Sequence, residues 1–306
     1  MAARRAWGDD GGMKIAMTGA SGLIGTALVP ALRADGHEVV RLVRRSPTGS
    51  DEARWDPAAG TVDLDRLAGT EAVIHLAGAG VGDHRWTDAY KREIHDSRTQ
   101  GTGTIARAMA RLDPLPRVLV SASAIGFYGD TGDRPVDETS PGGTGFLAEV
   151  VADWEAAAEP AREAGIRVVH PRSGLVMARS GGAWGRLLPL VKLGVGGRLG
   201  NGRQYWSFIT LTDEVRALRY LVDSELVGPV NLTAPSPATN AEVTAAMGHA
   251  LHRPTVLPVP AFALKVALGE FSSEVLGSAR VLPSALQRSG FTFRHPDLAS
   301  AVATLA

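Results

Sequence analysis

The chain has 306 residues, 44% of them hydrophobic and 21% charged, and its 32 basic and 32 acidic side chains give a formal net charge of zero. This length suits one large domain or two smaller ones, and the balanced charge disfavours a protein that binds nucleic acid or an anionic membrane. The sequence holds no cysteine, which excludes disulfides, zinc–thiolate sites and a cysteine nucleophile. It also lacks an apolar run of about 18 residues that could span a bilayer.

The first twelve residues, MAARRAWGDDGG, lack the apolar stretch of a signal peptide. We expect residues 1–12 to be a flexible extension, with Met13 as a candidate natural start. The simplest location for such a chain is the cytoplasm.

A glycine-rich turn follows the first predicted strand. Residues 14–18 are a short apolar run of the kind that forms a buried parallel strand. Residues 17–25, MTGASGLIG, then place glycines at Gly19, Gly22 and Gly25. Apolar residues at helical spacing follow from Leu23 and stop at Gly36, and residues 37–43 predict a second strand. The order strand, glycine turn, helix, strand is typical of a dinucleotide-binding βαβ unit.

The three glycines of this turn have separate tasks. The first permits the tight turn, the second lets backbone N–H groups approach a pyrophosphate, and the third lets helix and strand pack closely. The pyrophosphate would lie at the helix N-terminus, where free N–H groups and the helix dipole favour an anion. The expected contacts are the residues of the turn: Gly19, Ala20, Ser21, Gly22, Leu23, Ile24 and Gly25. The alternative is a tight turn without a ligand.

The end of the second predicted strand carries arginines, and no carboxylate lies nearby in the sequence. Proteins that bind NAD usually have Asp or Glu about 20 residues after the glycine motif, where it holds the ribose 2′-hydroxyl. Here Arg44 lies nineteen residues after Gly25, with Arg45 beside it and Arg41 earlier on the strand. A guanidinium suits a 2′-phosphate through a bidentate, charge-assisted contact. We therefore expect NADP(H) rather than NAD(H), unless these arginines are only a solvated strand end.

The elements that follow complete an α/β pattern. Residues 72–76 predict a buried strand that ends in the small residues 77–80, AGAG, which fits close approach of a cofactor. A long helix over 87–112 contains Gly101 and Gly103, which allow close packing or a bend. Further elements are strands at 117–121 and 168–171, a helix at 146–164, an apolar helix at 184–193, and a helix that runs from a capping box at Thr239 and Glu242 to Leu251. This order predicts a Rossmann-type doubly wound parallel sheet.

The histidines are expected to be structural. His75 lies inside a predicted buried strand, where a packed core histidine is the simpler interpretation. His249 and His252 are three residues apart on a predicted helix, but no third ligand accompanies them, so we expect no metal site.

Several motifs together resemble the short-chain dehydrogenase/reductase superfamily. They are TGASGLIG, HLAGAG, LVSASAIGFYG and GRQYWSFITLTDEV. The pieces RWDP, RWTDAYKREIHDSR and FLAEVVADWE are similar to one group of atypical, extended members. That group comprises epimerase-family oxidoreductases related to nucleoside-diphosphate-sugar epimerases; they are called cell-division-inhibitor-like and have a C-terminal domain of unknown function. The resemblance runs from Met13 to about Leu298.

The resemblance implies an NADP(H)-binding Rossmann domain over residues 13–180, to which residues 206–232 could return. A smaller C-terminal α/β substrate region would occupy residues 181–306, with the family's C-terminal domain at about 254–300. It implies cofactor contacts beyond the glycine turn from Arg44, Leu76, Ala77, Gly78, Glu93, Arg98, Ser121, Pro171, Ser173 and Leu175. The family histidine of the segment FITLTD is Thr210 here, so any role of that histidine is lost.

The catalytic pair of the superfamily is missing. Its members use a Tyr and a Lys four residues apart on one helix, together with a Ser or Thr. None of the four tyrosines has lysine four residues later, and the expected helix places Phe146 or Leu147 and Val150 or Val151 at these positions. The candidate catalytic residues are therefore Ser123, with Ser121 as the other serine, and Tyr128 and Glu149 as substitutes. The alternatives are a packed Tyr128 and a surface Glu149.

Two functions remain open from the sequence. The first is an NADP(H)-dependent oxidoreductase or epimerase-like enzyme that acts on a small carbonyl or hydroxyl compound, with a nucleotide sugar suggested only by the family resemblance. The second is a catalytically degenerate NADPH-binding sensor or regulator that acts through a protein partner. We expect a small-molecule substrate, no nucleic acid and no membrane, and leave a homodimer open.

Overall fold

The computed structural model describes residues 12–306, and the expected extension at residues 1–12 falls outside this range except for Gly12. The main sheet is built from β1 (Lys14–Thr18), β2 (Glu38–Val43), β3 (Glu52–Asp56), β4 (Thr61–Val62), β5 (Ala72–His75), β6 (Val118–Ser121), β7 (Ser123–Ala124), β9 (Arg167–Ser173) and β13 (Gly228–Leu232). The longer helices are α1 (Leu23–Ala34), α3 (Asp88–Met109), α4 (Phe146–Ala156), α6 (Gly182–Lys192), α7 (Leu211–Asp223) and α8 (Asn240–Ala250).

The shorter elements connect these or build the C-terminal part. The helices are α2 (Leu64–Leu67), α5 (Glu159–Glu163), α9 (Ala261–Leu268), α10 (Ser272–Leu276), α11 (Ser284–Arg288), α12 (Leu298–Ala303) and the 3-10 turns η1 (Ile125–Tyr128) and η2 (Gly269–Phe271). Two-residue and three-residue strands form three small pairs: β10 (Leu175–Met177) with β12 (Phe208–Thr210), β11 (Tyr205–Trp206) with β14 (Ala238–Thr239), and β15 (Arg280–Val281) with β8 (Pro135–Val136).

The main sheet confirms the predicted doubly wound topology. Its strand order is β13-β9-β6-β5-β1-β2-β3-β4, and the pairs between β13 and β3 are parallel. The chain moves outward from β1 to β3 in one direction and then returns to β5 on the other side of β1. The switch point of the sheet therefore lies between β1 and β5, where open α/β sheets bind ligands at the carboxyl ends of the strands.

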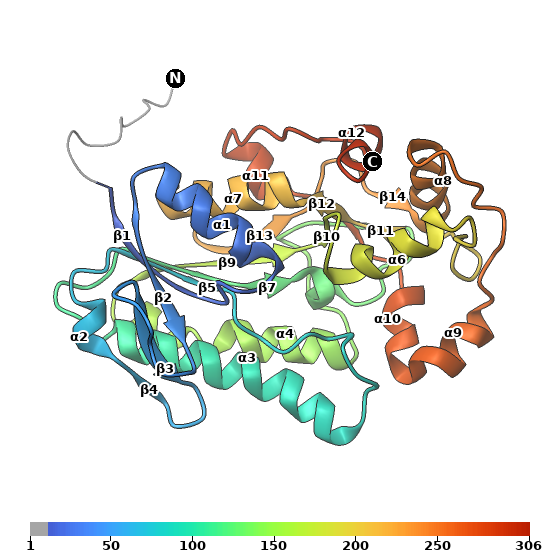
Figure 1. The fold of residues 1–306 in the computed structure, drawn as a ribbon. Helices are drawn as coiled ribbons and strands as arrows, with labels where there is room; N and C mark the ends of the chain where they lie inside the picture. The colour runs from blue at the N-terminus through green and yellow to red at the C-terminus, as the bar shows by residue number, and fades with distance from the viewer. Residues whose placement is uncertain (1–11) are drawn as a thin grey trace.

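Helices cover both faces of the sheet. In Figure 1, α1, α7 and α11 lie on one face and α3 and α4 on the other. Alternate residues of β1 serve the two layers, because Ile15 and Met17 pack toward α1 and α7 while Ala16 packs toward α3. All three are fully buried, which explains why the strand reads as a continuous apolar run.

The C-terminal elements gather beyond the carboxyl edge of the sheet. Figure 1 shows α6, α8, α9, α10 and α12 together at that side of the molecule. They share a core around Trp184, Phe208 and Met247 that is separate from the two cores of the sheet. Residues 211–232 leave this part again, since α7 packs against the sheet and β13 extends it beside β9.

The structure divides one of the long predicted helices and keeps another continuous. The helix predicted over 146–164 is wrong as one piece, because α4 ends at Ala156 and α5 begins at Glu159. Pro160, which has no amide hydrogen, occupies the first turn of α5 and favours a new start there. The long helix α3 runs through Gly101 without a break, and a Cβ at Gly101 would approach the His75 ring to 3.4 Å. This glycine therefore serves close packing.

Candidate functional site

The glycine turn brings β1, α1 and β5 into close backbone contact. Gly19 has a φ of +68°, and a Cβ there would lie 2.8 Å from the backbone carbon of Leu76. A Cβ at Gly25 would lie 2.2 Å from the carbonyl oxygen of Gly19 and 2.7 Å from the Cα of Ala20. Real Cβ contacts are longer than this, so both positions require glycine. The turn is thereby held in one shape, while Ser21 and Gly22 at its tip are exposed.

The N-terminus of α1 is open, as are those of α6 and α9, whereas α7 and α8 are capped by side chains. The N-cap of α1 is Gly22, no side chain caps it, and its first turn contains no acidic residue. By contrast, Thr210 caps α7, which has Asp213 and Glu214 in its first turn, and Thr239 forms a capping box in α8. The first N–H groups of α1 and the positive end of its dipole are therefore free to meet an anion.

Thr18 connects the ends of the two strands that flank the switch point. Its Oγ1 accepts hydrogen bonds from the amides of Leu76 and Ala77 at 3.1 and 3.2 Å. The same oxygen lies 2.7 Å from Nδ1 of His75. Burial lowers the pKa of His75 to about 4, so its ring is neutral. His75 is thus the packed core histidine that the sequence predicted.

The loop after β5 is held by side chains of α3. Arg98 donates to the carbonyl oxygens of Ala79 and Ile94 at 3.0 Å each, and its side chain lies 3.5 Å from the position of a Cβ on Gly78. Burial lowers the pKa of Arg98 to about 10. Glu93, by contrast, is exposed. Of the two α3 residues expected near a cofactor, only Arg98 faces the carboxyl edge of the sheet through this loop.

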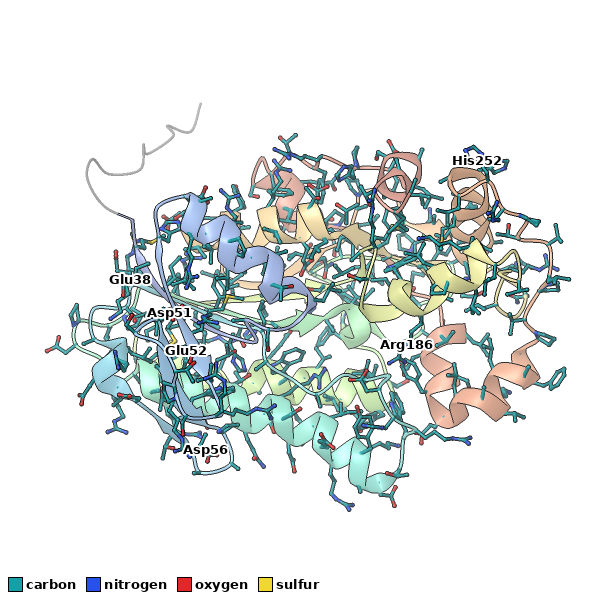
Figure 2. The ribbon with its side chains drawn as sticks, in the orientation of Figure 1. Glu38, Asp51, Glu52, Asp56, Arg186 and His252 are labelled. Carbon is teal, nitrogen blue, oxygen red and sulfur yellow. The ribbon has the colours of Figure 1, made fainter. Side chains whose placement is uncertain are left out.

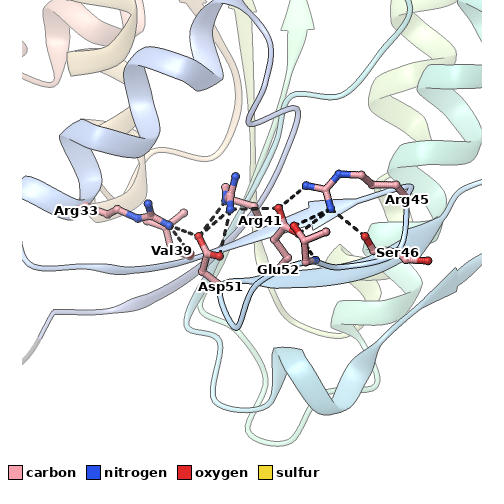
Figure 3. Close-up of polar contacts among 8 residues, drawn as sticks. Arg33, Val39, Arg41, Arg45, Ser46, Asp51 and Glu52 are labelled. Carbon is pink, nitrogen blue, oxygen red and sulfur yellow. Dashed lines mark hydrogen bonds and ion pairs between the residues drawn. The ribbon is translucent and has the colours of Figure 1, made fainter.

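The end of β2 carries two arginines in different situations. Arg45 donates to both carboxylate oxygens of Glu52, at 2.6 and 2.8 Å (Figure 3). Arg44 is exposed and has no hydrogen-bond or ion-pair partner among residues 12–306. The sequence showed no carboxylate near this strand end, but the fold brings Asp51 and Glu52 there from the start of β3. Both are already paired with arginines, which leaves Arg44 open to an anion.

Ser123, the expected catalytic serine, is part of a buried polar network. Its Oγ donates to Oε1 of Glu155 at 2.6 Å, and Arg172 binds the same carboxylate with two hydrogen bonds of 2.8 Å. The side chains of Arg172 and Glu155 are 4% and 14% exposed. Burial opposes ionisation of Glu155, but the hydrogen bonds and charge of Arg172 outweigh it and hold its pKa below the ordinary value. Glu155 is therefore an anion whose acceptor sites are largely occupied.

The two substitute residues proposed from the sequence lie in contrasting places. Tyr128 is buried, donates to Oδ1 of Asn231 at 2.8 Å and accepts from Arg172 at 3.0 Å. Burial raises its pKa, which keeps the phenol protonated. Glu149 is exposed in the first turn of α4. The carboxylate of α4 that contacts Ser123 is Glu155, which the sequence analysis quoted in FLAEVVADWE without assigning it a role.

The helix positions expected for the missing Tyr and Lys carry apolar side chains beside the chain that follows Ser123. A Cβ at Gly126 would lie 3.5 Å from Cβ of Leu147 and 4.0 Å from Cγ2 of Val151. Leu147 and Val151 are one helical turn apart on α4 and face the chain that follows Ser123. Neither can hold a proton, so any proton transfer has to come from other groups.

The carboxyl end of β9 provides such a group. Oγ of Ser173 donates to Oε1 of Glu214 at 2.6 Å, and Glu214 is fully buried. Its other oxygen has no partner among the described residues. Burial raises the pKa of Glu214 to about 7. Sequence patterns did not indicate this pair, because Glu214 follows Asp213 in an ordinary acidic first turn of a helix.

The remaining expected residues lie close to this end of the sheet. Ser121 ends β6 and is fully buried, with an Oγ that has no partner in residues 12–306. Pro171 is buried within β9, and the amide of Leu175 donates to the carbonyl oxygen of Ser207 at 2.9 Å. Parallel strands bring these residues and the glycine turn to one edge of the sheet.

Metal sites and membrane-spanning helices are two other features of interest in the described residues. In the described part of the chain, no group of three or more His, Asp or Glu side chains is arranged to hold a metal ion. No helix of residues 12–306 has both the length and the apolar character needed to cross a bilayer.

Comparison with known proteins gives two family matches and several relatives. Residues 15–232 match the NAD dependent epimerase/dehydratase family, and residues 259–305 match a domain of unknown function, DUF1731. The chain is 47% identical over 290 residues to an epimerase family protein of Mycobacterium bovis, which covers 94% of this chain and 96% of the relative. It is 33% identical to the human epimerase family protein SDR39U1 over 95% of this chain and 98% of that protein.

Solved structures agree with these matches. A crystal structure of human SDR39U1 with NADPH has a TM-score of 0.87 at 31% identity and covers 95% of this chain and 98% of that one. The structure of a nucleoside-diphosphate sugar epimerase from Corynebacterium glutamicum has a TM-score of 0.77 at 35% identity, over 96% of this chain and 58% of that one. With its parallel sheet, glycine turn and match over residues 15–232, the chain belongs to the NAD-dependent epimerase/dehydratase family of the short-chain dehydrogenase/reductase superfamily.

Proposed function

We propose that this chain binds NADP(H) and acts as an oxidoreductase or epimerase-like enzyme on a small carbonyl or hydroxyl compound, with a nucleotide sugar as one candidate. One observation carries the proposal. The open N-terminus of α1 follows β1, and the unpartnered Arg44 follows β2. Because β1 and β2 are adjacent and parallel, both features lie at the same edge of the sheet. The presence of NADPH in the human relative's structure supports the choice of cofactor.

The residues at this edge fit a dinucleotide with a 2′-phosphate. The first amides of α1, at Leu23 and Ile24, would hold the pyrophosphate, and the exposed tip at Ser21 and Gly22 leaves room for its approach. Arg44 would bind the 2′-phosphate, because Asp51 and Glu52 nearby are already neutralised by other arginines. A free carboxylate at the same place would favour the 2′-hydroxyl of NAD(H) instead.

When bound, NADP(H) supplies or accepts a hydride, and a substrate oxygen must then gain or lose a proton. Ser123 is poorly placed to donate that proton, because its hydroxyl hydrogen is committed to ionised Glu155. Ser173 and Glu214 offer another route. Glu214 can hold or release a proton near neutral pH, and Ser173 links its carboxyl group to the carboxyl end of β9. We assign the proton-holding role to this pair.

A sensor that works through a protein partner is the second candidate, and the closed network around Ser123 favours it. Ser123, Glu155, Arg172 and Tyr128 satisfy one another, and the residues expected at the Tyr and Lys positions, Phe146 or Leu147 and Val150 or Val151, are all apolar. In this case the chain would bind NADPH without turning it over.

Binding is tested by fluorescence titration with NADPH and NADH of the parent protein and of Arg44→Asp. We expect NADPH to bind at least about tenfold more tightly than NADH, which corresponds to about 1.4 kcal/mol, and Arg44→Asp to abolish this preference. Arg66→Asp, at an exposed arginine on α2, is the matched control and should leave the preference unchanged. Equal binding of both nucleotides by the parent protein would refute the assignment.

Turnover separates the two candidates. The protein is loaded with NADPH, offered a metabolite extract and followed by the loss of NADPH absorbance. An oxidoreductase consumes the nucleotide, whereas an epimerase returns the hydride and is detected by the isomerised product instead. Glu214→Gln slows either reaction without weakening NADPH binding. A sensor leaves both the absorbance and the composition of every extract unchanged while still preferring NADPH to NADH.

A further inference from the structure

The loop between β2 and β3 is closed by one buried carboxylate. The side chain of Glu52 is 1% exposed and lies under the loop residues that follow Arg44. It accepts two hydrogen bonds from Arg45, at 2.6 and 2.8 Å, and two from Thr48, at 2.7 Å from the amide and 3.1 Å from Oγ1. Arg41 also lies within 3.1 Å of it. Figure 3 shows the side chains of Glu52 and Arg45 pointing toward each other.

The neighbouring carboxylate has the same charge but a different task. Asp51 binds Arg33 of α1 at 2.6 Å and Arg41 of β2 at 3.0 and 3.1 Å (Figure 3). Its side chain is 37% exposed and makes no contact with Arg45 or Thr48 among the hydrogen bonds of the described residues. Both carboxylates lie on the β2 and β3 side of the molecule in Figure 2. Asp51 therefore links α1 to β2, while of these two carboxylates only Glu52 binds the side chains of the loop.

We propose that Glu52 is a positioning residue for NADP(H) discrimination, which fixes the loop that begins at Arg44 and holds Arg45 in an internal ion pair. Recognition of the 2′-phosphate then rests on Arg44. This inference rests on the proposed function and adds a determinant of its specificity.

The physical reason is preorganisation. A bidentate contact between guanidinium and phosphate demands a defined orientation of the backbone that carries the arginine. A loop that is ordered only upon binding loses affinity, because its conformational entropy is then taken from the binding free energy. Glu52 orders this loop before any ligand arrives, through hydrogen bonds at both Arg45 and Thr48.

The experiment uses two probes that differ only in the 2′-phosphate, namely AMP and adenosine 2′,5′-bisphosphate. Isothermal titration calorimetry at fixed ionic strength gives the affinity of the full chain for each probe. The ratio to follow is the affinity for adenosine 2′,5′-bisphosphate divided by the affinity for AMP. We expect Glu52→Gln to lower this ratio about tenfold, since the amide places a donor against Arg45. Asp51→Asn makes the same change of charge one residue away, and we expect it to alter the ratio by less than about twofold.

Further variants distinguish the loss of the Glu52 contacts from a change of charge and from general destabilisation. Thr48→Ala removes one contact to Glu52 without changing charge and should lower the ratio in the same direction, by less. General destabilisation would weaken both probes alike and leave the ratio unchanged. In an Arg44→Ala background, Glu52→Gln should have no further effect on the ratio.

The outcomes separate this inference from the proposed function. If the parent protein does not discriminate between the probes, or if Arg44→Ala leaves its preference intact, the proposed function fails. If Arg44→Ala abolishes the preference but Glu52→Gln and Asp51→Asn behave alike, the positioning role of Glu52 is overturned. A higher ratio in Glu52→Gln than in Asp51→Asn also overturns it, because Glu52 would then be competing with the phosphate for Arg45.

Discussion

The two ends of the same sheet edge are built in opposite ways. At the ends of β1 and β2, polar groups are left without partners, as the uncapped N-terminus of α1 and exposed Arg44 show. At the ends of β6 and β9, Ser123, Glu155 and Arg172 satisfy one another in a buried network. Unsatisfied groups at a glycine-rich turn are suited to a charged ligand, whereas a closed network mainly contributes stability.

This difference between the open and the closed end indicates where the chain departs from the chemistry of its superfamily. Its nucleotide end retains what a dinucleotide needs, but its chemical end has exchanged a Tyr and Lys for apolar residues and internal pairs. Some groups break the pattern of the closed end, since Oγ of Ser121 and one carboxylate oxygen of Glu214 have no partner among the described residues.

Loss of Arg172 should have the largest effect on stability. Arg172→Met leaves the buried carboxylate of Glu155 without its counter-ion, and removing one partner of such a pair costs about 3–5 kcal/mol. Urea unfolding measures the change. The matched control is Arg186→Met, because Arg186 forms an ion pair with Asp83 in which both side chains are 59% exposed. Arg186→Met should lower the free energy of unfolding by at most about 1 kcal/mol. Equal losses of unfolding free energy in the two variants would contradict a stabilising role of the closed network.

Glu214 should make stability depend on pH. Its folded pKa is raised to about 7, so the folded state keeps a proton that the unfolded chain releases from about pH 4.5 upward. The contribution of this residue to folding therefore becomes less favourable as pH rises from about 4.5 to about 7, by about 1.4 kcal/mol for each unit of pKa elevation. Glu214→Gln does not titrate, so its stability relative to the parent should increase over that range.

The measurement is urea unfolding of Glu214→Gln and the parent protein at several pH values across the window. Glu149→Gln, at an exposed carboxylate of α4, gives the baseline for removing a surface carboxylate. A stability difference between Glu214→Gln and the parent that does not change with pH would show that Glu214 is not the titrating group.

Gly25→Ala tests the rigid shape of the open end. The added methyl would lie 2.2 Å from the Gly19 oxygen, so the backbone of the turn must shift, and overpacking of this kind costs about 1–3 kcal/mol. NADPH affinity should fall more than tenfold at the same time, about 1.4 kcal/mol or more. In Gly103→Ala the methyl meets only the flexible end of Arg107 at 3.0 Å, and both quantities should stay near parent values.

Two serines at the closed end give the smallest effects and a direct contrast. Ser123→Ala removes a hydrogen bond of 2.6 Å to a charged acceptor and should cost about 1.5 kcal/mol in urea unfolding. Ser121→Ala removes a buried hydroxyl that has no partner among the described residues, and should be neutral or stabilising. Equal costs would show that the Ser123 contact adds nothing to the network.

Much of the fold was predictable because its signals are local. The strand at 14–18, the glycine turn and the helix ending before Gly36 match β1 and α1, and the capping box at Thr239 opens α8 as predicted. The error at residues 146–164 is also local, since Pro160 already marked the break between α4 and α5. That Phe146 or Leu147 and Val150 or Val151 stand at the Tyr and Lys positions stays a prediction, which depends on spacing along one helix.

The pairing of polar groups followed from the tertiary structure alone. Asp51 and Glu52 come to the end of β2 because β3 lies parallel to it, although the sequence around Arg44 contains no carboxylate. Glu155 and Arg172 are seventeen residues apart on different elements, and Ser173 and Glu214 are forty-one apart. By itself the sequence determined the αβ order, the glycine turn and the loss of the catalytic pair, because these depend on neighbours in the chain. Which charges are free, neutralised or protonated was decided only by folding, because burial and partners across the sheet set the free energy of each ionised group.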